Sequence, residues 1–173
     1  MKRILPLLAA VLWTASLGAQ PLKVNPVPGL DPDFIKGADV STLLAVEKAG
    51  GQFFDEAGKP GDALAILKNH GVNWIRLRLW NDPVVLAKRA KALGLKVLLD
   101  FHYSDTWADP SHQTTPKAWK GLDRPALEKA LYGFTKATLQ TMKDAGALPD
   151  MVQLGNETNG GMLWPVGKTF QST

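Results

Sequence analysis

The feature of this sequence that most restricts its fold is an alternation of short apolar runs with helical segments. The apolar runs predict strands at residues 34–40, 72–80, 95–101 and 150–154. Apolar residues at helical spacing predict helices at residues 62–70, 84–93 and 123–144. Strands that alternate with helices are typical of parallel βαβ units, so we expect an α/β chain with four such units.

The ends of the predicted helices carry residues suited to helix boundaries. Asp62 and Asp123 stand at the predicted N-termini, where a carboxylate can accept hydrogen bonds from free backbone N–H groups. Gly71, Gly94 and Gly146 follow the predicted C-termini, where glycine ends a helix at low cost. These residues support the helix assignments independently of the apolar pattern.

Polar or aromatic side chains follow each predicted strand at its C-terminal end. They are Asp39, Arg78, Trp80, Asp100, His102 and Glu157. In a (β/α)8 barrel this end of the strands forms the catalytic face. A doubly wound sheet also binds ligands there, but it usually carries a glycine-rich loop after its first strand, and none is present. We therefore expect a (β/α)8 TIM barrel of which about the first four β/α units are present.

Side chains along a strand alternate between its two faces, which groups the polar residues. The predicted groups are Trp74, Arg76, Arg78 and Trp80; Leu98, Asp100 and His102; and Gln153, Gly155 and Glu157. Buried arginines need ionic partners, so two on one strand face predict a carboxylate-rich interior at the barrel mouth. The alternative for either arginine is a solvated charge at the strand end.

The chain divides into three predicted segments. Residues 1–19 have a basic start, an apolar run and small residues near Ala19, which predicts a signal peptide and secretion to the extracellular space or periplasm; a membrane anchor is the alternative. Residues 20–33 contain four prolines and predict an extended lead-in. Residues 34–173 form the predicted barrel segment. No cysteine is present, and basic residues are scattered among acidic ones, which argues against a nucleic-acid partner.

The carboxylate of Glu157 allows three roles after the last predicted strand. It could act as the general acid/base of glycoside hydrolysis, bind a metal, or cap the following turn. Asn156 can hydrogen-bond to a sugar hydroxyl and Trp164 can stack on a sugar ring, which favours the first role. The stretch Asp100-Phe-His-Tyr-Ser-Asp105 leaves a metal-dependent hydrolase as an alternative. Two tryptophans of the polar loop 102–122, Trp107 and Trp119, suit either a core or a sugar-binding cleft.

Four stretches together resemble the arabinogalactan endo-β-1,4-galactanases of glycoside hydrolase family 53. They are GADVSTLLAVEKAG, GVNWIRLRLWNDP, AKRAKALGLKVLLDFHYSDTWADPSHQTTPKAW and PDMVQLGNETNGGMLWPVG. The resemblance extends in order over residues 33–170. It implies a TIM barrel of the clan A glycosidase type and a retaining endo-hydrolase of β-1,4-galactan, the type I arabinogalactan of pectin. It also implies a monomer at full length, with no cofactor required for the chemistry and no membrane partner after signal cleavage.

The resemblance also implies roles for individual residues. Glu157 matches the family's acid/base, and Asn156 matches the residue that holds the sugar 2-hydroxyl. Arg76 and His102 fall at positions where related enzymes orient the nucleophile and the substrate. The remaining motif positions that would line the cleft are Asp39, Arg78, Trp80, Asp105, Trp107 and Trp164.

The sequence departs from the family pattern at two places. Trp80-Asn-Asp-Pro83 leads directly into a helix, where family members usually have a longer loop, so this rim of the cleft is expected to be cut back. The family nucleophile is a second Glu at the end of strand seven, and no Asp or Glu follows Glu157 here. We therefore expect the N-terminal half of a galactanase, truncated and inactive alone, with any structural calcium site in the missing half. A non-catalytic galactan-binding or half-barrel assembly module is the alternative.

Overall fold

The computed structural model describes residues 25, 27–80 and 82–169. The predicted signal peptide at 1–19 and residues 20–24 and 26 of the predicted lead-in lie outside the described residues. The chain forms two units, Met1–Phe34 and Ile35–Thr173. The described part of the first unit contains two turns, in which Leu30 N donates to Val27 O and Phe34 N to Asp31 O, and no helix or strand.

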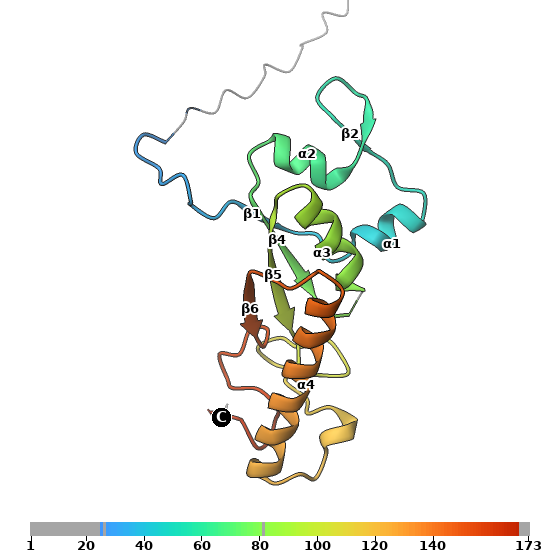
Figure 1. The fold of residues 1–173 in the computed structure, drawn as a ribbon. Coiled ribbons are helices and arrows are strands. Elements are labelled where there is room, and N and C mark those ends of the chain that lie inside the picture. Colours follow the sequence, from blue (N-terminus) through green and yellow to red (C-terminus); the bar gives the residue numbers. More distant parts are fainter. Residues whose placement is uncertain (1–24, 26, 81, 170–173) are drawn as a thin grey trace, which may run out of the picture. The chain divides into compact units, whose positions relative to one another are not determined.

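The Ile35–Thr173 unit is built on a parallel sheet of four strands in the order β1-β4-β5-β6. The strands are β1 (Gly37–Asp39), β4 (Trp74–Arg78), β5 (Lys96–Phe101) and β6 (Met151–Leu154). Strand β1 pairs with β4, β4 pairs with β5, and β5 pairs with β6, and all three pairs are parallel. All four predicted strands and their parallel arrangement are thus confirmed (Figure 1).

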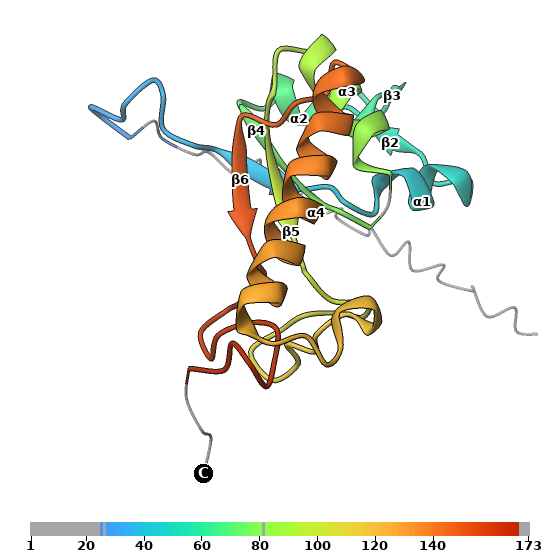
Figure 2. The same ribbon diagram turned by 60° about the horizontal axis from the view of Figure 1, so that its bottom comes forward.

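The three predicted helices fill the connections between these strands. They are α2 (Ala63–Asn69), α3 (Pro83–Ala92) and α4 (Arg124–Asp144). The Asp62 carboxylate accepts from Leu64 N at 2.7 Å, and the Asp123 carboxylate accepts from Ala126 N at 3.0 Å, so both predicted N-caps are confirmed. Figures 1 and 2 both show α3 and α4 beside β5.

Short elements between β1 and α2, and one in the long loop, were not predicted. They are α1 (Leu43–Lys48), a hairpin of β2 (Phe53–Phe54) with β3 (Pro60–Gly61), and a 3₁₀ turn at Lys117–Trp119. A six-residue helix and two-residue strands are too short to produce a periodic apolar pattern. Arg89 of α3 holds this region in place: it forms two hydrogen bonds with Glu47, at 2.7 and 2.9 Å, and one with Asp62 at 2.7 Å.

The hydrophobic core lies between the sheet and its helices. Alternate strand residues enter it and are almost completely buried: Ile75, Leu77, Val97, Leu99 and Phe101. They pack with buried residues of the helices: Leu64, Leu86, Ala87, Ala90, Leu127 and Met142. Burying a large aliphatic or aromatic side chain contributes about 1.5–3 kcal/mol. Because these strand residues face the helices, the residues between them point to the opposite face of the sheet, as the alternation predicted.

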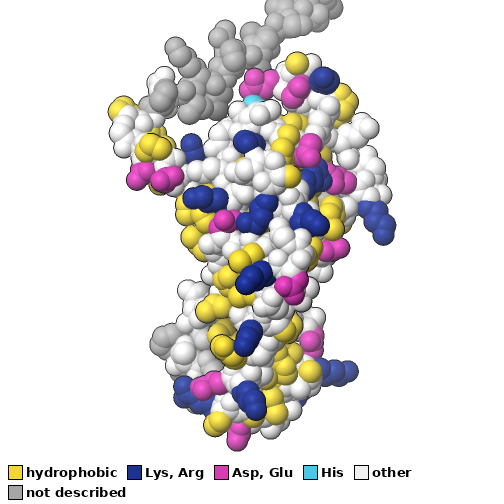
Figure 3. Space-filling view, viewed as in Figure 1, with side chains coloured by type: hydrophobic (Ala, Val, Ile, Leu, Met, Phe, Trp, Pro, Cys, Tyr) yellow, Lys and Arg dark blue, Asp and Glu magenta, His cyan; other side chains and the backbone are white. Residues whose placement is uncertain are grey.

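Figure 3 shows the face of the molecule that carries α3 and α4. Lys and Arg side chains are interspersed there with Asp and Glu side chains instead of forming one basic patch. In the part of the chain that the structure describes, no helix is long and apolar enough to cross a membrane.

Candidate active site

Arg76, in the middle of β4, gathers side chains from the other three strands of the sheet. Nη1 donates to Asp39 Oδ2 at 2.6 Å, and Nη2 donates to Asp100 Oδ2 at 2.6 Å and to Asn156 Oδ1 at 2.8 Å. Nε donates to Gln153 Oε1 at 3.1 Å. The predicted carboxylate-rich interior is therefore present, and one guanidinium connects the C-terminal ends of β1, β5 and β6.

Asp39 is shared between the two arginines of β4. Its Oδ2 also accepts from Arg78 Nε at 3.1 Å, and its Oδ1 accepts from the backbone N and the hydroxyl of Ser41 at 3.0 and 2.7 Å. Partial burial alone would raise the pKa of Asp39, but the hydrogen bonds from Ser41, Arg76 and Arg78 lower it to about 2. Asp39 is thus a fixed negative charge at neutral pH.

Asp100 and His102 are the buried polar pair at the end of β5. Burial raises the pKa of Asp100 to about 6, against the opposing charge of Arg76. Burial, assisted by the charges of Arg76 and Arg78, lowers the pKa of His102 to about 4, so its imidazole is neutral at pH 7. Ala108 N donates to His102 Nδ1 at 3.3 Å, which places the imidazole proton on Nε2.

The contact between these two residues is close but not a regular hydrogen bond. His102 Nε2 lies 3.0 Å from Asp100 Oδ2. Within residues 25, 27–80 and 82–169, His102 Nε2 and Asp100 Oδ1 nonetheless lack any partner with hydrogen-bond geometry. This buried pair therefore retains one donor and one acceptor with unused hydrogen-bonding capacity.

Two exposed tryptophans form an aromatic surface beside this cluster. Trp80 is 41% exposed and Trp107 is 47% exposed, and their ring centroids lie 5.6 Å apart. The ring of His102 lies 4.5 Å from Trp80 and 5.2 Å from Trp107. The guanidinium of Arg78 lies over the ring of Trp107 at 4.7 Å, a cation–π contact that fixes the orientation of this indole. Exposed indole faces next to charged and amide groups suit a carbohydrate ligand.

The chain changes direction directly after β6. Gly155 has φ of 90° and Glu157 has φ of 51°, so the strand alternation does not continue past Leu154. Gln153 donates to Gly155 O at 2.9 Å and accepts from Arg76, and Asn156 also reaches Arg76, which alternation along the strand did not predict. Glycine accepts a positive φ without cost, whereas Glu157 adopts one at a steric penalty.

Glu157 itself is exposed next to this cluster. Its negative charge adds slightly to the rise in the pKa of Asp100 and slightly opposes the lowering of the pKa of His102. Among the residues that the structure describes, its carboxylate has no hydrogen-bond or ion-pair partner. The carboxylate is therefore available to a ligand, in contrast to Asp39 and Asp100, which Arg76 holds.

Two of the predicted cleft residues lie apart from Arg76. Asp105 accepts from Lys117 N at 2.7 Å and lines a cavity of about 440 Å³ together with Trp80 and His102. Trp164 lies in the 155–169 loop, where its indole N–H donates to Gly160 O at 3.0 Å and Lys168 Nζ lies 4.6 Å from its ring. The sequence pattern alone did not indicate that Asp105 and Trp164 would lie away from Arg76, unlike the other predicted cleft residues.

The stretch that suggested a metal site is divided between two environments. Asp100 pairs with Arg76, whereas Asp105 binds the backbone of Lys117. Over the described ranges of the chain, no three His, Cys, Asp or Glu side chains come together in a group that could hold a metal ion.

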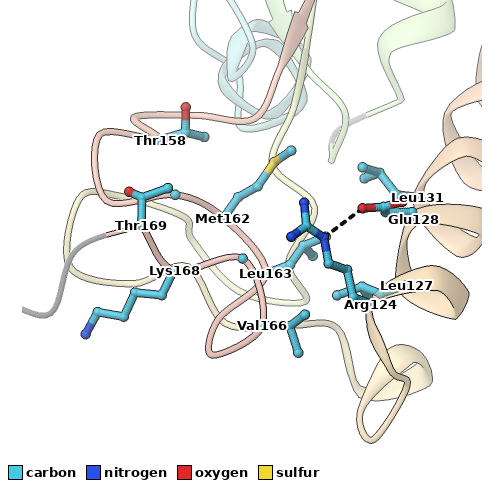
Figure 4. Close-up of a pocket in the computed structure, with 12 residues that line it drawn as sticks. Arg124, Leu127, Glu128, Leu131, Thr158, Met162, Leu163, Val166, Lys168 and Thr169 are labelled. Atoms are coloured by element: carbon cyan, nitrogen blue, oxygen red, sulfur yellow. Dashed lines mark hydrogen bonds and ion pairs between the residues drawn. The ribbon is translucent and has the colours of Figure 1, made fainter.

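A second cavity, of about 410 Å³, lies between the start of α4 and the 158–169 segment (Figure 4). Leu127, Leu131 and Met162 are among its apolar lining residues, and Arg124 donates to Glu128 at 3.0 Å beside it. None of the predicted site residues lines this cavity, so it is separate from the cluster around Arg76.

The connection after β4 is as short as the sequence indicated. Strand β4 ends at Arg78 and α3 begins at Pro83, so four residues join them. Asp82 adopts a left-handed conformation with φ of 47° immediately before α3, and its side chain does not cap the helix. The short connection leaves Trp80 close to the helix start and exposed.

Three residues that hold the site together were not among the predicted site residues. Ser41 and Gln153 bind Asp39 and Arg76 directly, and Gln113 of the long loop is 2% exposed and donates to Asn156 O at 2.7 Å. Only the alternation along β6 pointed to Gln153. For Gln113, the sequence offered a single indication of a role in the site: it is an amide residue within the polar loop 102–122, whose tryptophans were predicted to suit a core or a sugar-binding cleft.

Comparisons with known proteins agree with this geometry. Residues 35–172 match the model of glycosyl hydrolase family 53. The chain is 45% identical to an endo-beta-1,4-galactanase of Bacillus subtilis over 188 aligned residues, covering 88% of this chain and 44% of the relative. It is 42% identical to an arabinogalactan endo-beta-1,4-galactanase of Humicola insolens, covering 78% of this chain and 43% of the relative.

Solved structures give the same result. The Ignisphaera aggregans GH53 catalytic domain superimposes with a TM-score of 0.81 at 49% identity, covering 86% of this chain and 46% of that one. The chain thus spans less than half the length of the relatives it matches, and its four-stranded parallel sheet is part of a (β/α)8 barrel. With the family model matching most of its length, the chain belongs to glycosyl hydrolase family 53.

Proposed function

We propose that the full-length product of this gene is a retaining endo-hydrolase of β-1,4-galactosidic bonds in galactan or arabinogalactan. The galactanase names of the relatives support the substrate class. The observation that carries the proposal is the exposed carboxylate of Glu157 after β6, directly following Asn156, which Arg76 holds at 2.8 Å.

In this proposal Glu157 is the general acid/base. It protonates the leaving glycosidic oxygen in the first step and then deprotonates the water that hydrolyses the glycosyl–enzyme intermediate. Its carboxylate is exposed at the end of β6, where a polysaccharide can reach it. General acid/base catalysis of this kind contributes about 10²- to 10⁴-fold in rate.

Asn156 is proposed to hold the sugar 2-hydroxyl. Its Oδ1 accepts from Arg76 at 2.8 Å and its Nδ2 donates to Ala108 O at 2.7 Å, so the amide is fixed on both sides. One Oδ1 lone pair and one Nδ2 hydrogen remain for a ligand. A preorganised amide of this kind can strengthen its hydrogen bond as charge develops in the transition state.

A retaining mechanism requires a second carboxylate about 5 to 5.5 Å from the first. Asp39 and Asp100 are both bound by Arg76, so neither suits a nucleophile that must attack carbon. Because the chain covers less than half of its relatives, we propose that another part of the full-length protein supplies the nucleophile. Arg76 and neutral His102 then orient that nucleophile and the substrate.

Trp80 and Trp107 are proposed to stack against galactosyl rings. Arg78 and Asp39, which form an ion pair, are proposed to supply the polar surface of the cleft. Asp105 and Trp164 remain predicted cleft residues; Asp105 accepts from Lys117 N, and the Trp164 indole donates to Gly160 O.

We further propose that the protein is secreted after cleavage of residues 1–19 and acts on the galactan of pectin. The two-carboxylate chemistry uses no cofactor. Retention of activity with a chelator present would argue against the metal-dependent alternative, and binding of galactan without cleavage would favour the non-catalytic alternative.

The proposal can be tested on the full-length gene product with purified polysaccharides. We expect galacto-oligosaccharides from β-1,4-galactan, little release from β-1,4-xylan or β-1,4-mannan, and a β-anomer as the first product seen by ¹H NMR. Initial formation of the α-anomer would contradict retention, and cleavage of xylan or mannan in preference to galactan would contradict the substrate.

A further inference from the structure

The side chain of Gln113 binds the backbone of the two residues that carry the proposed chemistry. Nε2 donates to Asn156 O at 2.7 Å and to Asp109 O at 2.9 Å, and it lies 3.4 Å from Glu157 O. The three neighbours are carbonyl oxygens, which only accept, so the amide nitrogen and not the amide oxygen must face them. Gln113 is 2% exposed, which shields these bonds from competition with water.

The backbone that Gln113 contacts has an unfavourable conformation. Glu157 has φ of 51°, a value that residues with a side chain rarely adopt. Such a conformation persists only when its surroundings hold it. Among the described residues, Gln113 supplies the hydrogen bonds that the Asn156 and Glu157 carbonyls receive, so it is the group best placed to maintain this turn.

Gln113 also connects two loops through its own backbone. Trp164 N donates to Gln113 O at 2.7 Å, so loop 102–122 is attached to the 155–169 loop on both sides of Glu157. The position of the Glu157 carboxyl therefore depends on a residue 44 positions earlier in the sequence. Proton transfer is sensitive to such placement, since an error of about 1 Å can lower a rate by about 100-fold.

We infer that Gln113 is a positioning residue that holds the Glu157 carboxyl where it can protonate the leaving oxygen. This inference rests on the acid/base role proposed for Glu157. It assigns loop 102–122 a function in proton transfer in addition to its tryptophan in the cleft. Because Gln113 is 2% exposed, the role inferred for it is to act through Glu157 and not by contact with the substrate.

The test compares two aryl β-galactobiosides on the full-length protein. One releases 2,4-dinitrophenolate, which departs without protonation, and the other releases a phenolate that needs a proton. The measured quantity is the ratio of their kcat/KM values, the activated substrate over the unactivated one. Because both values refer to the same sample, the ratio does not depend on how much of a variant is folded.

Gln113→Met keeps the side-chain length but removes the donor, and Gln113→Glu places a carboxylate against the carbonyl oxygens. For both we expect the ratio to rise by about 10- to 100-fold, because only the substrate that needs a proton is affected. An unchanged ratio in both variants would overturn the inference.

Thr115→Val is the matched control. Thr115 Oγ1 donates to Trp164 O at 2.8 Å, so this hydrogen bond also joins loop 102–122 to the 155–169 loop, but it does not involve the carbonyls of Asn156 and Glu157. We expect its ratio to stay within about 2-fold of the unmodified protein. A rise equal to that of Gln113→Met would show general loosening of the loops and would also overturn the inference.

Glu157→Gln tests the proposed acid/base function of Glu157 separately from the positioning role of Gln113. If Glu157 is the acid, Glu157→Gln raises the ratio at least as much as the Gln113 variants. An unchanged ratio in Glu157→Gln contradicts the proposed function itself. A raised ratio in Glu157→Gln with no change in the Gln113 variants contradicts only the positioning role.

Discussion

Arg76 and Asn156 are separated by 80 positions in the sequence, yet Arg76 Nη2 donates to Asn156 Oδ1 at 2.8 Å. The same nitrogen lies 2.6 Å from Asp100 Oδ2. Since Asn156 directly precedes Glu157, this guanidinium fixes the proposed acid/base relative to the neighbouring strands. The bond depends on correct pairing of β4, β5 and β6, and so couples formation of the sheet to formation of the site.

Arg76→Lys should therefore impair catalysis in the full-length protein. A lysine ammonium is a compact charge and cannot serve four acceptors that the planar guanidinium reaches together. We expect kcat/KM on galactan to fall by about 100-fold or more. Arg124→Lys is the matched control, because Arg124 forms an exposed pair with Glu128 on α4, and it should change activity by less than about 2-fold. Equal losses in the two variants would contradict a specific role for Arg76.

Asp100 should give stability a distinct dependence on pH. Its pKa is raised to about 6 in the folded protein from 3.8, so the folded state binds the proton more tightly. Its contribution is therefore complete below about pH 4 and is lost as the pH rises through 6. Asp39 and His102 affect the free energy of unfolding in the opposite direction. Their pKa values are lowered in the folded protein, so the stability they contribute is lost as the pH falls.

Asp100→Asn isolates the contribution of Asp100. We expect the free energy of unfolding of the unmodified protein, relative to this variant, to fall by about 2–3 kcal/mol between pH 4 and pH 7. Denaturant unfolding at four pH values measures this difference. A difference that is constant or increases with pH would show that Asp100 has no raised pKa.

Trp107→Ala should weaken substrate binding more than it slows the chemical step. Trp107 is exposed beside the cluster and held by Arg78, which suits a stacking surface for a sugar. We expect KM on galactan to rise by about 10-fold with kcat changed by less than about 3-fold. Tyr132→Ala removes another exposed aromatic residue, on α4, and should leave both constants unchanged. A fall in kcat alone for Trp107→Ala would exclude a role in binding.

Asp62 and Asp123 allow the effect of a helix cap to be separated from that of an ion pair. Both cap helices, but only Asp62 also binds Arg89, at 2.7 Å. Asp123→Ala should cost about 1 kcal/mol, and Asp62→Ala should cost more. Asp62→Asn keeps a capping oxygen and should recover part of the loss. Equal costs for Asp62→Ala and Asp123→Ala in thermal unfolding would show that the Arg89 pair contributes nothing.

The sequence was sufficient to predict the elements that bury a periodic apolar face. The 72–80 and 95–101 runs became β4 and β5 because Ile75, Leu77 and Leu99 have to face the helices. That burial also determined which side Arg76 and Asp100 occupy. The elements without such a face, α1 and the β2–β3 hairpin, were missed because they are too short for a periodic pattern; α1 is held by a tertiary contact, from Arg89 to Glu47.

Details of the site that depend on local backbone conformation could not be predicted. Alternation did not predict that Asn156 would reach Arg76, which it does after the turn at Gly155, where φ is positive. The carboxylate-rich interior was predicted, but the specific pairing of Asp100 with Arg76 was not, because it depends on strand register. Gln113 lies 43 residues before Asn156, and no periodic pattern connects a loop residue with a turn at that distance.

The most direct test of the account is azide rescue of Glu157→Ala in the full-length protein. The variant should lose activity on galactan, since no group remains to protonate the leaving oxygen or to activate water. With a 2,4-dinitrophenyl β-galactobioside, added azide should accelerate turnover and give the β-glycosyl azide, because azide needs no general base. Full activity of the variant on galactan, or formation of the α-glycosyl azide, would contradict the assignment of Glu157 as the acid/base.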